Sequence, residues 1–258
     1  MKKHNHEIRD LVYVHLNENG QYVISYGVEF SVFAQSLSRS LNHLLLIKHQ
    51  FDDGELNRHT LLEYVPRDSL RKLVKDNIYA YGDFCWVDFE EIDGLDELSG
   101  QEIAELLFLG HQKRHLKGPF YNKLGNRYVY LSRYDSWFNK TYYRQINDFY
   151  RMLGNVIAIK LEELKIEKTL IGIRKKRSYP PVNLDIILSL SKFMREGTVI
   201  SLRNITQNRN RIEIPIWVIG DFDNMDDMIE EFDQMKREKC DAKLVLEKKT
   251  REWALFTQ

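Results

Sequence analysis

The stretch FYNKLGNRYVYLSRYDSWFNKTYYRQINDFYRMLGNVIAIKLEEL, residues 120–164, decides the predicted fold. It predicts a short strand at about 126–134, a turn at Asp135 and Ser136, and then the longest helix of the chain at about 139–164. Apolar residues recur along this helix at three- and four-residue steps, which is the pattern of one helix face: Ile146, Tyr150, Leu153, Ile157, Leu161 and Leu164. We therefore expect the helix to be the central packing element.

The strand before this helix has two chemically different faces, because successive side chains of a strand point to opposite sides of the sheet. Val129 and Leu131 share one face, with Arg127 and Arg133 at its ends. The other face carries hydroxyl groups throughout, on Tyr128, Tyr130, Ser132 and Tyr134. Two interpretations remain open for the tyrosine face: it is part of the core, or it is a flat platform on which bases stack.

The segment before residue 120 predicts a mixture of strands and helices. Two β-rich runs flank the sequence NENG at 17–20, and Asn-Gly is a strong signal for a hairpin. Other predicted elements are a helix at 30–48, a short helix after Pro66, a strand at 84–89, and a helix that begins at the Ser99–Glu102 capping box and continues to about Arg114.

The segment after residue 164 predicts a separate C-terminal unit. The basic run at 174–177 and Pro180–Pro181 form the best candidate linker. Beyond it we expect an amphipathic helix at 183–196 and then the order ββαββ. This unit has a hairpin at 198–203 and 211–219, a helix at 224–239, and strands at 242–246 and 253–256; Pro215 suggests an edge strand. The fold class is therefore α+β with antiparallel pairing, and we expect a main domain at 1–177 and a C-terminal subdomain at 178–258.

Charge is strongly segregated along the chain, although the net charge is zero. Residues 76–108 contain ten acidic residues and no Lys or Arg, whereas residues 109–177 contain sixteen Lys and Arg against five acidic residues. Residues 221–235 contain seven acidic residues and no basic ones. Such blocks indicate charged partners, unless the acidic and basic blocks face one another within the molecule.

Several classes of protein are disfavoured by the sequence. It contains no apolar run long enough for a membrane span, and MKKHNHEIRD has no apolar region of a secretory signal after it. The two cysteines, Cys85 and Cys240, are far apart, which argues against a disulfide scaffold or a zinc knuckle. No Gly-rich phosphate loop follows a predicted strand. We therefore expect a cytoplasmic protein without a cofactor.

The basic residues indicate a surface that binds nucleic acid or another polyanion. Cations contact phosphates, and aromatic faces stack on bases. The candidate binding residues are Arg127, Tyr128, Tyr130 and Arg133 on the strand, Arg174, Lys175, Lys176 and Arg177 before the prolines, and Arg203, Arg209 and Arg211 at the tip of the second hairpin. This pattern favours a non-catalytic binding or regulatory protein, because we recognise no catalytic signature.

Two alternatives remain. The complementary charge blocks suit a protein–protein contact or self-association, with an acidic surface as the partner. A metal-dependent hydrolase would use His111 and His115, which are four residues apart on a predicted helix and so could reach one ion. The HExxH pattern is absent, since Gln, Lys and Arg occupy 112–114, and a solvated basic helix end explains the pair more simply.

Overall fold

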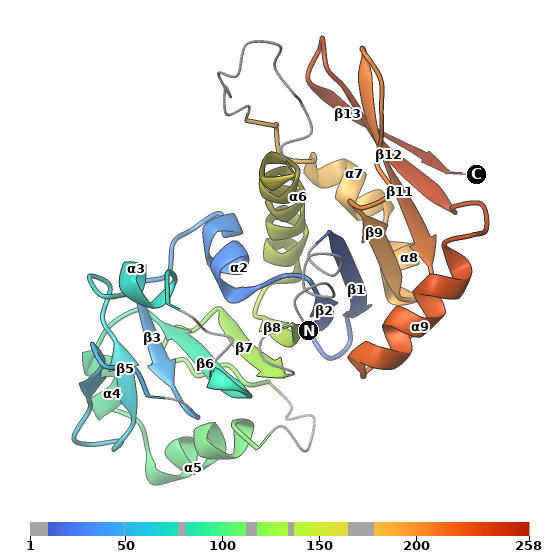
Figure 1. Cartoon of the computed structure of the whole chain (residues 1–258). Coiled ribbons are helices and arrows are strands. Elements are labelled where there is room, and N and C mark those ends of the chain that lie inside the picture. Colours follow the sequence, from blue (N-terminus) through green and yellow to red (C-terminus); the bar gives the residue numbers. More distant parts are fainter. Residues whose placement is uncertain are drawn as a thin grey trace.

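A computed structural model describes residues 10–48, 50–76, 81–111, 118–133, 137–164 and 178–257. Helices and strands are mixed and the strands form one antiparallel sheet, which confirms the α+β class (Figure 1). The described helices are α2 (Phe30–Ser36), α3 (Leu70–Leu73), α4 (Asp93–Asp96), α5 (Gly100–Leu109), α6 (Ile146–Glu163), α7 (Leu184–Ser189), α8 (Ser191–Arg195) and α9 (Met225–Met235). None of the helices within these ranges is long and apolar enough to cross a membrane.

The sheet follows the order β13-β12-β11-β9-β1-β2-β8-β7-β6-β3-β5-β4, and β10 pairs with β11 beside this path. Its strands are β1 (Leu11–Asn17), β2 (Tyr22–Tyr26), β3 (His43–Leu46), β4 (Glu55–Leu56), β5 (Glu63–Val65), β6 (Phe84–Phe89), β7 (Tyr128–Arg133), β8 (Phe138–Tyr143), β9 (Thr198–Ser201), β10 (Thr206–Gln207), β11 (Arg211–Val218), β12 (Ala242–Glu247) and β13 (Glu252–Thr257). The NENG turn joins β1 to β2.

Helix α6 forms the core on one face of this sheet. Its buried side chains belong to a cluster that also takes residues from β1, β6, β7, β11 and β12, so one helix spans both halves of the sheet. Two neighbours hold α6 closely: Asn155 donates a hydrogen bond to Ser36 O of α2 (2.7 Å), and Val182 N donates to Gly154 O (3.2 Å). A Cβ at position 154 would lie 2.4 Å from Val182 O, so Gly154 is needed for this approach.

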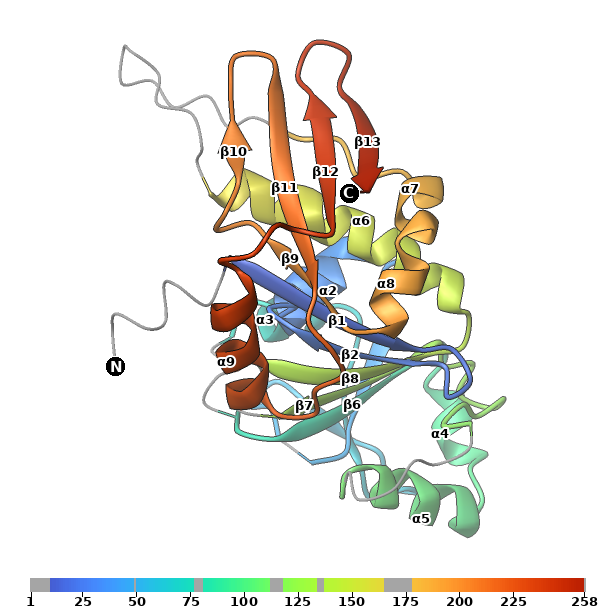
Figure 2. The same cartoon turned by 90° about the vertical axis from the view of Figure 1, so that its right-hand side faces the viewer.

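The opposite face of the sheet is covered in two separate places (Figure 2). Helices α4 and α5 pack over β6 and β7 through Leu95, Leu106 and Leu109. Helix α9 packs over β1 and β11 through Met228 and Phe232. The two clusters meet at Ile24 of β2, which contacts both.

The predicted start of the long helix was wrong. Residues 138–143 form β8, which pairs with β2 on one side and β7 on the other, and the helix begins only at Ile146. Phe138, Tyr142 and Tyr143 are aromatic residues that suit a strand. With hydrogen-bonding neighbours on both sides, sheet pairing overrides the helical spacing of these residues.

The predicted helix at 30–48 was also too long. Helix α2 ends at Ser36, and residues 43–46 form β3 between β5 and β6. Leu44 and Leu46 pack into the cluster around α6, whereas Leu45 packs into the cluster under α5. A strand buried on both faces reads as a continuous apolar run, which the sequence cannot distinguish from a buried helix. Similarly, α5 ends at Leu109, and the predicted continuation at 112–114 lies outside the described residues.

Pro215 does not mark an edge strand, because β11 lies inside the sheet between β12 and β9. On the side away from β12, β11 pairs with β10 at residues 212–213 and with β9 at residues 216–218. Pro215 lies in the gap between these ladders, where its missing N–H is tolerated. The predicted domain boundary lies between residues 177 and 178, and the sheet contains strands from both sides of it, since β9 pairs with β1. The division into two domains stays a prediction.

Candidate polyanion-binding surface

The tyrosine face of β7 belongs to the core. Tyr128 and Tyr130 are each 2% exposed, and both rings contact Phe33, with centroid distances of 5.7 Å and 5.1 Å. The Tyr130 hydroxyl donates to Val28 O at 3.0 Å. A ring that stacks on a base must present an open face, and neither ring does. Tyr134 lies outside the described residues.

Arg127 is enclosed by carboxylates of the acidic block. Its Nε lies 3.4 Å from Asp88 Oδ2 and 3.5 Å from Glu90 Oε1, and its Nη2 donates to Ser40 O at 3.0 Å. Glu90 in turn pairs with Arg39 at 2.9 Å. The Arg127 side chain is 15% exposed and its charge is compensated, so we assign it to the fold.

Asp88 is the buried anchor of this group. Its Oδ1 accepts from Arg127 N (2.8 Å) and from Tyr128 N (2.6 Å), which fixes the start of β7 beside the end of β6. Burial raises the pKa of Asp88 to about 6, although the Tyr128 N–H bond and the Arg127 charge act in the opposite direction. Lys123 also pairs with Glu102 at 2.8 Å. The acidic and basic blocks therefore face one another in part within the molecule.

Arg133 lies at the far end of β7, opposite Phe138 of β8, and is half-buried. Diagonally across the same face is Lys140, whose Nζ lies 4.0 Å from the Tyr22 ring centroid and 5.0 Å from that of Tyr142. Burial, and then the positive charge of Arg133, lower the pKa of Lys140 to about 8. Lys140 was not among the predicted site residues, and it lies in β8, where a helix was predicted.

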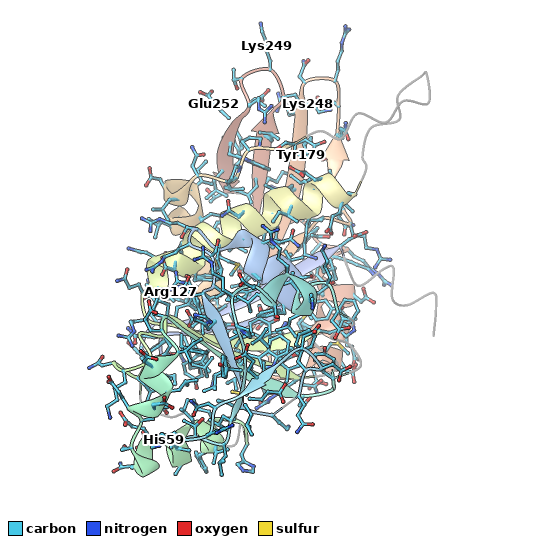
Figure 3. All side chains as sticks on the ribbon, turned by 90° about the vertical axis from the view of Figure 1, so that its left-hand side faces the viewer. His59, Arg127, Tyr179, Lys248, Lys249 and Glu252 are labelled. Carbon is cyan, nitrogen blue, oxygen red and sulfur yellow. The ribbon has the colours of Figure 1, made fainter. Side chains whose placement is uncertain are left out.

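Two of the remaining candidate arginines, Arg209 and Arg211, lie where two hairpins of the C-terminal half end, whereas Arg203 lies further back between β9 and β10, with its N–H on Asp10 O. We call residues 203–211 and 248–251 the tip surface. It contains six Lys and Arg and no Asp or Glu, while Glu247 and Glu252 flank it. Lys248 is half-buried and the other cations are exposed: Arg203, Arg209, Arg211, Lys249 and Arg251. Figure 3 shows Lys248 and Lys249 at one end of the molecule, away from Arg127 and His59.

Hydrogen bonds join the two turns into one unit. Lys248 N donates to Asn210 O at 2.7 Å, and Lys248 Nζ donates to Asn208 O at 2.9 Å. The Asn208 side chain accepts from Asn210 N and Arg211 N, at 2.8 Å and 2.9 Å, which closes the first turn. The cations of both turns are therefore held on one frame.

The tip cations differ in how far neighbouring residues compensate their charge. Arg211 lies 3.7 Å from both Glu213 and Glu247, so it contributes little net charge. Arg251 donates to Ser178 O at 3.0 Å, and a neutral carbonyl leaves its charge in place. The predicted cluster Arg174, Lys175, Lys176 and Arg177 lies outside the described residues, but in sequence it directly precedes Ser178.

Only one of the two proposed metal ligands, His111, lies within the described residues. His111 lies just beyond the end of α5, with its ring centroid 6.4 Å from that of Phe108. His115 lies outside the described residues. Within the ranges that the structure describes, there is no group of three or more His, Cys, Asp and Glu that could hold a metal ion.

Sequence reasoning missed Lys248, Lys249 and Arg251 as part of the basic surface. The sequence does contain a signal for these residues. It predicts a turn at 204–210 and a turn at 248–251 in one four-stranded unit, and both turns carry cations. Comparison with protein-family models, with curated proteins and with solved structures finds no match to this chain, so function is inferred from its own residues.

Proposed function

We propose that this chain is a non-catalytic binding protein that contacts nucleic acid through the tip surface. The observation that carries the proposal is the joining of two cationic turns on one frame, through the Lys248 bonds to Asn208 and Asn210. Phosphate groups are bound by such clusters of Lys and Arg, mainly through electrostatic attraction and the release of counterions.

The proposal now differs from the sequence-based hypothesis in its binding residues. Arg209, Lys248, Lys249 and Arg251 are the expected phosphate contacts at the joined turns, and Arg203 and the run at 174–177 stay candidates from the sequence. Arg127, Tyr128 and Tyr130 are assigned to the fold because of their burial and partners. Arg133 stays a secondary candidate; it lies on the same face of the sheet as Val129 and Leu131.

The test is the affinity for a fluorescently labelled single-stranded oligonucleotide, measured by anisotropy at low salt. We expect Arg209→Glu/Lys249→Glu to weaken binding at least tenfold and Lys175→Glu/Lys176→Glu to weaken it as well, without unfolding the chain. The matched control is Arg58→Glu/Arg71→Glu, which makes the same charge change at exposed positions near β4 and α3. An equal loss of affinity in the control would show that only net charge matters.

The same assay separates nucleic acid from an acidic protein partner. A chain that binds neither single-stranded nor double-stranded nucleic acid at low salt, yet binds polyglutamate through the tip residues, would be a protein-binding module. No retention on any polyanion would refute the proposal.

A further inference from the structure

The strand β13 forms one margin of the sheet, and nothing in the described part of the chain pairs with its outer side. The opposite margin is β4, which has only two residues, whereas β13 has six. An unpaired strand of this length presents a row of N–H and C=O groups that can template another strand. Helix α7 lies near β13 but packs against the core face of the sheet, since Ile187 of α7 and Trp253 of β13 belong to one cluster (Figure 2).

Natural edge strands are usually protected by Lys, Pro, a bulge, or a helix or loop that covers the edge. Residues 252–257, EWALFT, contain none of these residues, and their pairing with β12 is unbroken from Glu252 to Thr257. The side chains there are also apolar on the open face. Phe256 is 54% exposed on the face of β13 that points away from the core cluster containing Trp253. The edge therefore combines free backbone groups with uncovered apolar side chains.

We propose that β13 pairs antiparallel with β13 of a second copy of this chain, which extends the sheet across a two-fold axis. In such a pair, residues opposite each other lie on the same face. With the axis at Leu255, Ala254 faces Phe256 of the second copy, Trp253 faces its Thr257, and Leu255 faces itself. Within residues 253–257 each pair joins an apolar residue to an apolar residue or to Thr, so this part of the strand is complementary to itself.

The charge distribution also favours a second copy of the chain as the partner and an antiparallel direction of pairing. The only charged residue of β13 is Glu252, at one end, so no like charges meet within the strand pair. The cationic turn 248–251 precedes the strand directly. With the axis at Leu255, antiparallel pairing places the two turns at opposite ends, with the Arg251 residues about 27 Å apart at ~3.4 Å per residue. Parallel pairing would place them side by side, where they would repel.

The test is molecular mass in solution, measured by sedimentation equilibrium over a range of protein concentrations. We expect the wild-type chain to form a dimer. Ala254→Lys/Phe256→Lys puts lysines directly opposite each other, and Ala254→Glu/Phe256→Glu does the same with glutamates, so we expect each variant alone to be monomeric. Mixed together, the two variants should form a heterodimer, because Lys then faces Glu. The control Leu56→Lys/Leu107→Lys changes exposed leucines elsewhere and should stay dimeric.

Three results would overturn the proposal. A wild-type chain that stays monomeric at its highest attainable concentration has no such interface. A dimer that persists in both charged variants forms through another surface. A dimer that dissociates in high salt is held by the complementary charge blocks, since backbone pairing and apolar contacts are not weakened by screening.

Discussion

Replacing Arg127 by Met tests whether this arginine belongs to the fold or to the binding surface. The substitution keeps a long apolar stem and removes the cation that faces Asp88 and Glu90. Removing one partner of a buried ion pair costs roughly 3–5 kcal/mol. The Arg127–Asp88 contact is long, at 3.4 Å, and Asp88 keeps two backbone N–H bonds. We therefore expect the lower end of this range, a loss of about 3 kcal/mol at pH 8.

The same loss should shrink in mild acid. Asp88 has a pKa of about 6, so at pH 5 most of the carboxyl group is protonated and needs no counter-charge. Urea unfolding of wild type and Arg127→Met at the two pH values measures the difference. Oligonucleotide affinity of the folded variant should keep its wild-type salt dependence. A variant that unfolds like wild type but binds more weakly would place Arg127 on the binding surface and refute this assignment.

Three further outcomes are expected. The Asp88 carboxyl group should titrate near pH 6 in an NMR experiment, and a midpoint below pH 4 would contradict this prediction. Because the pKa is raised from 3.8, the stabilisation from the protonated group is present below pH 4 and is lost as the pH rises through 6. Gly197→Ala should lower the free energy of unfolding by about 2 kcal/mol or more, because φ is +81° and the new Cβ would lie 1.8 Å from Gly220 O. The control Gly100→Ala, in the open first turn of α5, should not lower it. The Lys140 amine should titrate near pH 8, and a midpoint above 10 would show that it is fully hydrated.

Local signals were sufficient for several elements. The NENG turn places β1 against β2, and alternation in residues 84–89 assigns Cys85 and Val87 to one face and Phe84 and Trp86 to the other. The Ser99–Glu102 capping box is present, with Glu102 accepting from Ser99 N at 2.7 Å. Each of these features is decided by residues close together in the chain.

Features decided by distant partners were not predictable. Residues 138–143 have a helical spacing of apolar groups, and only the flanking strands β2 and β7 make them a strand. Likewise, Arg127 looks like a surface cation until Asp88, which is 39 residues away, is placed beside it. The tip surface depends on the register of β11 with β12, which brings Asn210 to Lys248.

The salt dependence of oligonucleotide affinity tests the central claim most directly. Each phosphate contact adds about 0.7 to the slope of log affinity against log salt for a single strand. Removing two contacts with Arg209→Gln/Lys249→Gln should therefore lower the magnitude of the slope by about 1.4, while Arg58→Gln/Arg71→Gln leaves it unchanged. Equal slopes for wild type and the tip variant, or a wild-type affinity that does not vary with salt, would contradict binding through the tip surface.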